Sequence, residues 1–270
     1  MATPEDIRGN YVKVKGTRTF YDDIGEGQPI VCVHTAGASS LEYQYILPMF
    51  AEQGFHAYAL DLPGHSRSYP VNWRQHRTIH EHAEFVHAFI KTLRLKSPVL
   101  IGCSIGGDIT LDYAAYHWRE LAAGVPMEGL GRSPTFPLPS SMVHPAWAPG
   151  WQDMMERAAI ESLNRNCSAA QIEELRWQHR NSQVSAVGDL EGWARHDVLA
   201  KLKNIGCPML VIRGEDDFWL PRELAEETAK AIKGAEIRHL RNIGHYPMFE
   251  DPKLICKVVT DFCRRHGVLS

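Results

Sequence analysis

The stretch that decides the fold is Val99-Leu100-Ile101-Gly102-Cys103-Ser104-Ile105-Gly106-Gly107. Residues 99–101 form an apolar run typical of a buried strand, and residues 108–116 carry the apolar spacing of a helix. Ser104 therefore lies on a tight turn between a strand and a helix. Such a turn requires glycine two positions away on either side of the serine, because the backbones there leave no room for a Cβ. The Gly-x-Ser-x-Gly pattern predicts a nucleophile elbow, which aims the serine hydroxyl out of the sheet.

The composition is that of an ordinary globular protein, with 270 residues of which 44% are hydrophobic and 23% are charged. A net charge of −3 and a pI near 6.5 give no electrostatic reason to expect a nucleic acid or an anionic membrane as partner, so we expect a small-molecule substrate. Residues 1–8 lack the apolar core of a signal peptide, and no apolar run is long enough to span a bilayer. These features predict a soluble, cytoplasmic protein and leave its oligomeric state open.

The sequence indicates neither a cofactor nor a metal ion. It contains no glycine-rich phosphate-binding loop. His80-Glu81-His82 has the residue types of a metal site, but residues two apart on a helix face away from each other, so we expect a polar helix face instead. The cysteines form no Cys-x-x-Cys pair and several lie within apolar patterns, which predicts buried free thiols. They are Cys32, Cys103, Cys167, Cys207, Cys256 and Cys263.

Strands and helices alternate along most of the chain. The predicted strands are residues 11–15, 17–21, 29–34, 56–60, 99–101, 121–128, 208–213 and 236–240. The predicted helices are residues 41–53, 78–93, 108–116, 222–232 and 253–265. The first two strands read as an antiparallel hairpin, because only Gly16 separates them. The alternation of the others predicts an α/β fold with a mostly parallel, twisted sheet that is flanked by helices.

The alternation stops between residues 129 and 196. This segment opens with five prolines and then returns to helical patterns. We interpret it as an inserted helical cap, residues 129–196, on a core domain built from residues 1–128 and 197–270. Its large apolar side chains indicate a roof over a pocket, although most of them can equally pack the cap onto the sheet. The aromatic candidates for lining the pocket are Trp147, Trp151, Trp177 and Trp193, joined by Trp219 and Tyr246 from outside the cap.

An acid and a histidine follow the elbow in chain order, each just past the end of a predicted strand. Gly214-Glu215-Asp216-Asp217 follows the strand at residues 208–213, and Gly244-His245 lies shortly after the strand at residues 236–240. Parallel sheets place their ligands at these strand ends. Serine, acid and histidine in this order form the arrangement in which the histidine takes the serine proton and the acid fixes the imidazole tautomer.

Together these motifs resemble those of the α/β-hydrolase superfamily of capped serine hydrolases, over essentially the whole chain. The matching segments are the His34 loop, residues 61–68, residues 102–107, residues 214–217 and Gly244-His245. The resemblance implies the α/β-hydrolase fold, with Ser104 as nucleophile, Asp217 as acid and His245 as base. It also implies that the backbone N–H groups of Ala36 and Ile105 form an oxyanion hole, and that no cofactor is needed.

Some positions depart from the family pattern or compete with it. Thr35 stands where the family often has glycine, so its hydroxyl becomes a candidate pocket group. Glu128 follows the preceding strand, where some relatives, including zearalenone-type lactonases and certain haloalkane dehalogenases, carry their acid. We favour Asp217, which stands third after the glycine, and keep its neighbour Asp216 and the more distant Glu128 as alternatives, the latter also as a pocket residue. Dehalogenase and epoxide-hydrolase chemistry is disfavoured, because the nucleophile there is aspartate and here it is Ser104.

The expected activity is cofactor-independent hydrolysis of a small, largely apolar carboxylic ester or lactone through an acyl-enzyme. A C–C bond or an amide is an alternative target, because the same three residues serve those reactions. Tyr246 makes the C–C reaction less expected, since hydrolases of that type carry tryptophan after the histidine. A slow-turnover small-molecule receptor of the same fold is an alternative from a different functional class.

Overall fold

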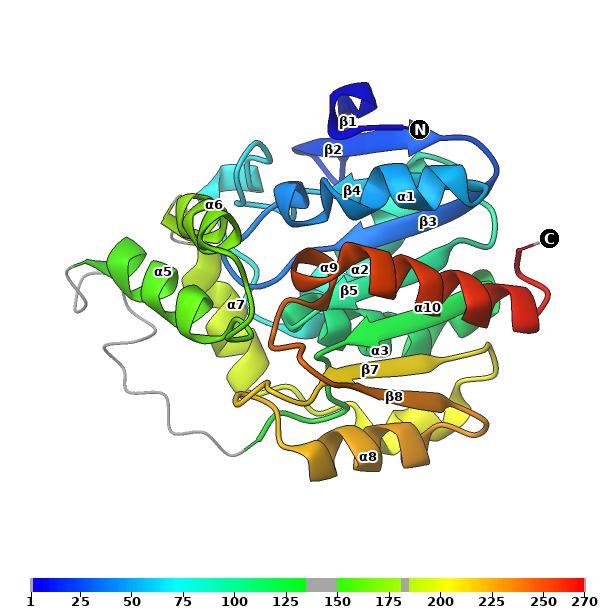
Figure 1. The fold of residues 1–270 in the computed structure, drawn as a ribbon. Helices are drawn as coiled ribbons and strands as arrows, with labels where there is room; N and C mark the ends of the chain where they lie inside the picture. Colours follow the sequence, from blue (N-terminus) through cyan, green and yellow to red (C-terminus); the bar gives the residue numbers. More distant parts are fainter. Residues whose placement is uncertain (1, 135–149, 181–184, 270) are drawn as a thin grey trace.

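The computed structural model describes residues 2–134, 150–180 and 185–269. Its centre is an eight-stranded sheet in the order β1-β2-β4-β3-β5-β6-β7-β8 (Figure 1). The strands are β1 Arg8–Val14, β2 Thr17–Gly25, β3 Gln28–Val33, β4 Phe55–Leu60, β5 Val99–Cys103, β6 Ala123–Met127, β7 Leu210–Gly214 and β8 Glu236–Leu240. β1 and β2 form the predicted antiparallel hairpin, β2 also pairs antiparallel with β4, and the remaining pairs are parallel. The predicted fold class is therefore confirmed.

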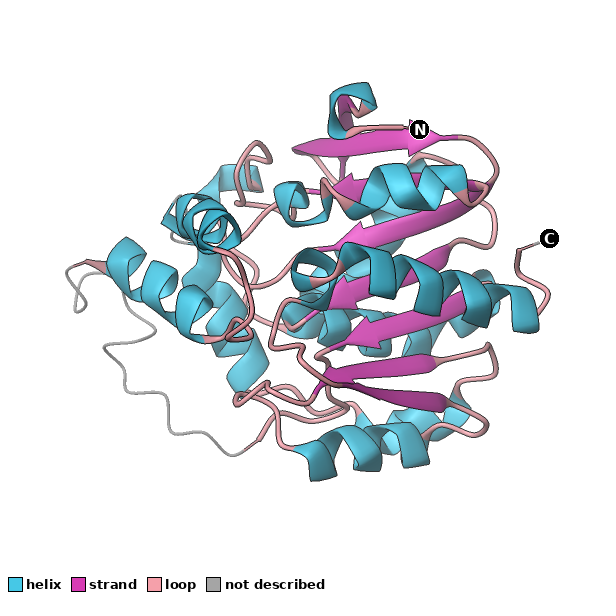
Figure 2. Cartoon of the chain, in the orientation of Figure 1, coloured by secondary structure: helices cyan, strands magenta, loops and turns pink. Residues whose placement is uncertain are grey.

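Helices cover both faces of the sheet (Figure 2). One face carries α1 Ile46–Glu52, α9 Pro247–Glu250 and α10 Pro252–Arg265, and the other carries α2 Ile79–Thr92, α3 Ile105–His117 and α8 Arg222–Ala231. Alternate residues of β5 enter the two cores, with Ile101 on the α10 side and Leu100 on the α2 side. This burial on both faces explains why the central strands read as continuous apolar runs.

One predicted helix is shorter than expected. In place of a helix over residues 41–53, the chain forms a 3₁₀ turn, Ser40–Tyr43, and then α1, Ile46–Glu52. Pro48 explains the break, because proline lacks an N–H and its ring collides with the carbonyl four residues earlier in a continuous helix. In the first turn of α1 the missing donor carries no penalty, since the first four N–H groups have no partner within the helix.

Between β6 and β7 the described residues form three α-helices. They are α5 Trp151–Glu161, α6 Ala169–Arg180 and α7 Ser185–Ala194, which we call the cap helices. Figure 1 shows them, green to yellow, beside the carboxyl ends of the parallel strands. The elbow serine and the loops after β3, β7 and β8 lie at the same strand ends, so the cap helices stand over the region in which the sequence predicts the site.

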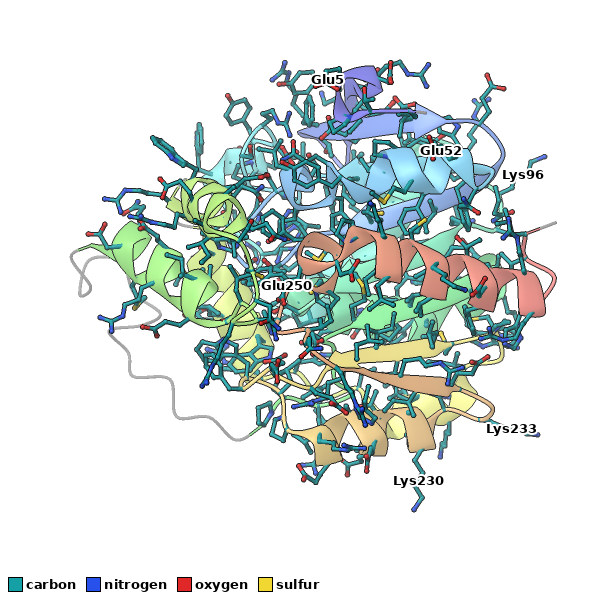
Figure 3. The ribbon with its side chains drawn as sticks, viewed as in Figure 1. Glu5, Glu52, Lys96, Lys230, Lys233 and Glu250 are labelled. Atoms are coloured by element: carbon teal, nitrogen blue, oxygen red, sulfur yellow. The ribbon has the colours of Figure 1, made fainter. Side chains whose placement is uncertain are left out.

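Charged side chains on the outside contrast with a few that turn inward. Lys96, Lys230 and Lys233 project from the periphery in Figure 3, whereas Glu250 lies near the cap helices.

All six cysteines are free thiols, and five of them are buried, as predicted. Among the helices of the described residues, none has the length and apolarity needed to cross a membrane.

Candidate active site

Ser104 occupies a strained turn between β5 and α3. Its φ of 57° and ψ of −122° are unfavourable for a residue other than glycine. A Cβ at Gly102 would lie 2.1 Å from the carbonyl oxygen of Gly106, and a Cβ at Gly106 would lie 2.2 Å from the carbonyl oxygen of Val33. Both glycines are thus required by close backbone contact. The turn leaves Ser104 at the N-terminus of α3, where the helix dipole favours negative charge.

His245 is paired with Asp217 across two neighbouring strand ends. His245 Nδ1 lies 2.8 Å from Asp217 Oδ2, and Asp217 Oδ1 accepts the backbone N–H of Trp219 at 2.7 Å. Burial alone would raise the pKa of Asp217, but the charge of His245 lowers it to about 2. Burial would likewise lower the pKa of His245, and the charge of Asp217 reverses this and raises it. The pair therefore consists of an ionised carboxylate that orients an imidazole.

The two other candidate acids have different partners. Glu128 Oε1 accepts the backbone N–H of Gly214. Burial, and then the charge of Asp217, raise the pKa of Glu128 well above its usual range. Asp216 accepts a hydrogen bond from the side-chain amide of Asn164. Of the three acids, Asp217 is the one that bonds the His245 ring.

Carboxylates hold the loop after β3 on both sides of Ala36. The backbone N–H of Thr35 donates to Glu42 Oε2 at 2.9 Å, and the Thr35 hydroxyl donates to Glu42 Oε1 at 2.7 Å. The N–H of Gly37 donates to Asp189 Oδ2 of α7 at 3.0 Å. Both carboxylates are buried. Because the N–H groups of Thr35 and Gly37 are held by these hydrogen bonds, the backbone conformation of the loop is fixed at Ala36.

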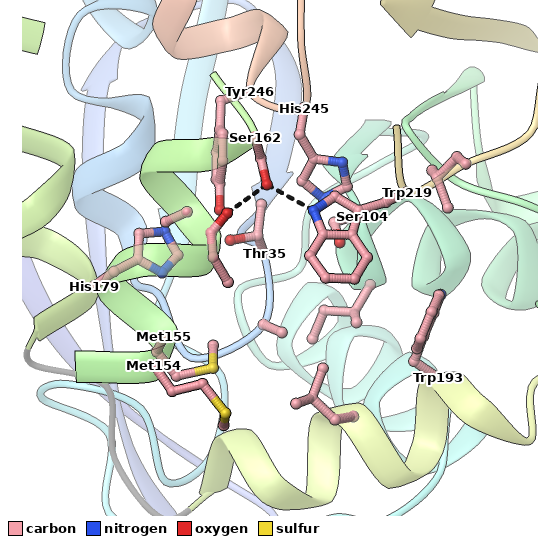
Figure 4. A pocket seen from close by; sticks show the side chains of 16 residues that line it. Thr35, Ser104, Met154, Met155, Ser162, His179, Trp193, Trp219, His245 and Tyr246 are labelled. Carbon is pink, nitrogen blue, oxygen red and sulfur yellow. Dashed lines mark hydrogen bonds between the residues drawn. The ribbon is translucent and has the colours of Figure 1, made fainter. Parts of the chain in front are cut away.

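These elements meet at one pocket, with a cavity volume of about 100 Å³ (Figure 4). Its wall is mostly apolar, and the cap helices α5 to α7, together with the turn after α5, supply eight of its sixteen residues. From the core come Thr35, Ala36, Ser104, Ile105, Trp219, Leu220, His245 and Tyr246, and from the cap helices and the turn after α5 come Met154, Met155, Ala158, Ala159, Ser162, His179, Leu190 and Trp193.

Comparison with known proteins agrees with this architecture. Residues 30–258 match the model of the family described as "Alpha/beta hydrolase family". The chain belongs to this family. It is 26% identical to the AB hydrolase superfamily protein YisY of Bacillus subtilis over 94% of this chain and 98% of that protein. It is 25% identical to the 2-hydroxy-6-oxo-6-phenylhexa-2,4-dienoate hydrolase of Comamonas testosteroni, over 91% of each chain.

A solved structure shares the fold of this alpha/beta hydrolase. The enol-lactonase from Burkholderia xenovorans LB400 superposes with a TM-score of 0.86 and 20% sequence identity, covering 94% of this chain and 100% of that chain. The similarity extends over the core and the cap helices together, because almost the whole of both chains is matched. This chain and the solved structure thus share one fold over almost their whole lengths.

The predicted pocket residues divide into three groups in this alpha/beta hydrolase. Thr35, Trp193, Trp219 and Tyr246 line the pocket. The prediction for Trp177 is wrong, since it is 66% exposed and lies outside the pocket. It precedes the buried His179 by two positions on α6, which places the two side chains on different faces of the helix. Trp147 and the side chain of Trp151 lie outside the described residues.

Sequence reasoning missed the charged residues that hold the loops of the site. Glu250 accepts the backbone N–H groups of Gly244 at 2.8 Å and Tyr246 at 3.0 Å, and thereby fixes the chain on both sides of His245. The guanidinium of Arg213 donates to the carbonyl of Asp217 at 2.9 Å, as well as to two neighbouring carbonyls. Glu250 and Arg213 lie close in sequence to His245 and Asp217, and this proximity is the sequence signal that could have indicated them. The sequence does not show which backbone groups they bond.

Histidines elsewhere make separate contacts. His80 Nδ1 lies 2.7 Å from Asp112, whereas His82 Nε2 lies 3.1 Å from Asp189, so the two rings face different partners. The predicted polar helix face does not include His82, which is buried against Asp189. A group with metal-ligating atoms within 4.8 Å of one another occurs on α2 and α3, formed by Glu84, His87 and His117. It lies outside the pocket and takes no part in the site.

Proposed function

We propose that this chain is a serine hydrolase that cleaves a small, largely apolar carboxylic ester or lactone through an acyl-enzyme. The observation that carries the proposal is that Ser104, on a strained elbow, lines the same apolar pocket as the His245–Asp217 pair. A strained serine at a helix N-terminus beside an oriented imidazole is the arrangement that activates a hydroxyl as nucleophile. The family assignment and the relatives named as hydrolases lend further support.

The reaction proceeds in two halves. In the first, His245 Nε2 takes the proton of the Ser104 hydroxyl while its oxygen attacks the substrate carbonyl, and Asp217 stabilises the imidazolium through Nδ1–H. The N–H groups of Ala36 and Ile105 donate to the oxyanion of the tetrahedral intermediate. His245 then returns the proton to the leaving alcohol oxygen, and the Ser104 ester remains. In the second half His245 deprotonates water, which attacks that ester to form a second tetrahedral intermediate. Its collapse breaks the bond between the acyl carbon and the Ser104 oxygen and releases the acid, while His245 returns the proton to Ser104.

The size and lining of the pocket favour compact, apolar substrates. A cavity of about 100 Å³ accommodates a short acyl or alcohol part, and the methionine and tryptophan side chains around it exclude water. We propose that residues 129–196 act as the cap of a core formed by residues 1–128 and 197–270. Removal of water strengthens the hydrogen bonds to the oxyanion, because the local dielectric constant falls.

Cleavage of a C–C bond is the second candidate, because one of the relatives is named as a dienoate hydrolase. Tyr246, which follows His245, is buried in the pocket wall. A vinylogous diketone tested beside matched esters separates these reactions, since it is consumed at a comparable kcat/KM only if the C–C reaction is the native one.

Ester turnover and serine labelling test the proposal. We expect the wild-type protein to hydrolyse p-nitrophenyl butyrate with steady turnover and a fluorophosphonate to label Ser104. Ser104→Ala lowers kcat by about 10⁴- to 10⁶-fold and abolishes labelling while the fold is retained. Ser162→Ala, which removes another pocket serine, retains the label. A burst without further turnover indicates a receptor, and labelling at another serine contradicts the assignment of Ser104.

A further inference from the structure

A second histidine–carboxylate pair stands in the pocket wall, apart from His245 and Asp217. His179 of α6 is only 1% exposed, and its Nε2 lies 3.3 Å from Glu42 Oε1. Figure 4 shows the His179 ring on the other side of Thr35 from His245, turned toward the pocket. The pair joins a cap helix to the core, and the mechanism proposed above does not use it.

Glu42 is ionised and fixes which ring nitrogen faces it. Burial alone would raise its pKa, but the hydrogen bond and charge of His179, with the donors of Thr35, hold that pKa below the usual range. The two Thr35 donors already occupy both oxygens of the carboxylate. An ionised carboxylate attracts a proton on the nearer nitrogen, so His179 presents Nε2–H to Glu42 and leaves Nδ1 for another partner.

Among the described residues neither ring nitrogen of His179 has a hydrogen-bond partner of good geometry, but Nε2 lies within ion-pair distance of Glu42, at 3.3 Å, whereas Nδ1 has no such contact. The neighbouring pocket wall is apolar, with Met154 and Met155 on the adjacent helix α5. The other polar cap group in the wall is already engaged, because the Ser162 hydroxyl accepts from Trp219 Nε1 at 2.6 Å. A buried polar atom without a partner costs free energy in the empty pocket, and a substrate group that bonds it recovers that cost.

We propose that His179 Nδ1 binds a hydroxyl group on the substrate, so that the preferred substrate is a hydroxylated ester or lactone. The inference rests on the proposed hydrolase function. A hydroxyl group fits the observations because it donates to a neutral imidazole and accepts from a protonated one, and it carries no charge into an apolar cavity. A substrate carboxylate would add a net charge beside the ionised Glu42 in the same low-dielectric region.

Recognition of this kind discriminates strongly against substrates that lack the group. A site built around a polar atom rejects an analogue in which a methyl group replaces the hydroxyl, because the polar atom is then buried against carbon. We expect the hydroxylated substrate to have a kcat/KM higher than that of its methyl analogue by about 10- to 100-fold. Thr35 and Glu42 act in this recognition by fixing the orientation of the His179 ring.

The test uses matched pairs of phenyl esters. One member of each pair carries a hydroxyl group at carbon 3, 4 or 5 of the acyl chain, and the other carries a methyl group at the same carbon. The measured quantity is the hydroxyl-to-methyl ratio of kcat/KM, which a general loss of activity does not change. In the wild type we expect this ratio to exceed about 10 at one position. A third series with a carboxylate at that position is expected to react more slowly than the hydroxyl series.

Variants on α6 attribute the ratio to His179. His179→Leu is expected to bring the ratio to about 1 or below, and His179→Gln, which keeps a hydrogen-bonding group, to retain part of it. Trp177→Leu is the matched control, since Trp177 lies on the same helix but is exposed, and it keeps the wild-type ratio. If His179→Leu does not fold, the test rests on His179→Gln, in which we expect a hydroxyl-to-methyl ratio lower than that of the wild type.

Two results overturn the inference: a wild-type ratio near 1 at every position, or a high ratio that survives in both His179 variants. Failure of the proposed function gives a different result, namely the absence of Ser104-dependent hydrolysis of any ester. In that case calorimetric binding of amide analogues of the same pairs to the Ser104→Ala protein measures hydroxyl recognition without turnover. Equal Kd values for the two members of every pair then contradict the role of His179.

Discussion

The backbone N–H of Gly37 donates to the carboxylate of Asp189 at 3.0 Å, so the loop beside the Ser104 elbow is bonded directly to a cap helix. Asp189 is completely buried, and its carboxylate also lies 2.7 Å from His65 Nε2 and 3.1 Å from His82 Nε2. His65 Nδ1 faces the carbonyl of Pro63, so both ring nitrogens face acceptors and the ring is protonated. Burial alone would lower the pKa of His65, but the charge of Asp189 raises it. Helix α7 is thus joined to the loop of Ala36 through a buried carboxylate that also forms an ion pair with His65.

Asp189→Asn is expected to affect stability and catalysis together. Leaving the protonated His65 without its counter-ion costs about 3–5 kcal/mol in the free energy of unfolding, measured by urea denaturation. Because Gly37 loses a charged acceptor next to Ala36, kcat is expected to fall by about tenfold, which is less than the loss of an oxyanion donor itself. Asp153→Asn is the control, since Asp153 forms an exposed ion pair with Arg180 of the cap. If the variant is less stable but its kcat is unchanged, Asp189 only holds α7 against the core and does not affect catalysis through the Ala36 loop.

Acidification is expected to destabilise the protein between pH 6.5 and 4 through His34. The backbone N–H of Leu62 donates to His34 Nε2 at 3.0 Å, so the ring proton is on Nδ1, which faces the carbonyl of Thr35 at 2.7 Å. The ring is therefore neutral, and burial, with the charge of His65, lowers its pKa to about 4. The unfolded chain binds this proton at a higher pH than the folded chain does, so stability is complete above pH 6.5 and falls as the pH approaches 4.

The loss attributable to His34 is on the order of 3 kcal/mol over this interval. Urea unfolding at several pH values measures it, and His34→Gln, which lacks a titrating group, is expected to flatten the slope. The substitution keeps an acceptor for Leu62 and a donor for Thr35, so the comparison is made within a similar hydrogen-bond pattern. An unchanged slope in the variant would assign the acid sensitivity to other buried groups, among them His196, whose pKa burial also lowers to about 4.

Asp217→Asn and Glu128→Gln are expected to differ strongly in activity. Asparagine at position 217 donates to His245 Nδ1 and stabilises the wrong imidazole tautomer, which lowers kcat by about 10⁴-fold. Glutamine at position 128 keeps the oxygen that accepts the Gly214 N–H, and Glu128 makes no contact with the His245 ring, so kcat is expected to change by less than about tenfold. Steady-state kinetics on one ester measures both effects. The reverse order would identify Glu128 as the working acid.

The parts of the fold and site that the sequence predicts are those encoded by short segments. The elbow around Ser104 needs only a strand, two glycines and a helix start, and Asp217 follows its strand by a few residues. Glu42 and His179 are different, because their contact joins a loop to an inserted helix and depends on how that helix is rotated. The helix α6 has buried residues at Leu175 and His179 amid exposed neighbours, and its sequence does not indicate this face clearly.

The tryptophans of the cap provide a last prediction, because one lies in the pocket and another outside it. Trp193 is 8% exposed and lines the cavity beside Leu190, whereas Trp177 is 66% exposed. Trp193→Ala removes a large flat surface that excludes water from the bound ester, so KM is expected to rise for bulky apolar esters and the preferred acyl length to change. It also lowers the free energy of unfolding by about 3–5 kcal/mol, since a buried aromatic ring is lost. Trp177→Ala is expected to leave the acyl-length profile unchanged. Profiling both variants on p-nitrophenyl esters of increasing length, with thermal melts in parallel, separates the two roles: a destabilised Trp193→Ala protein with the wild-type profile would mean that Trp193 only packs the cap onto the sheet.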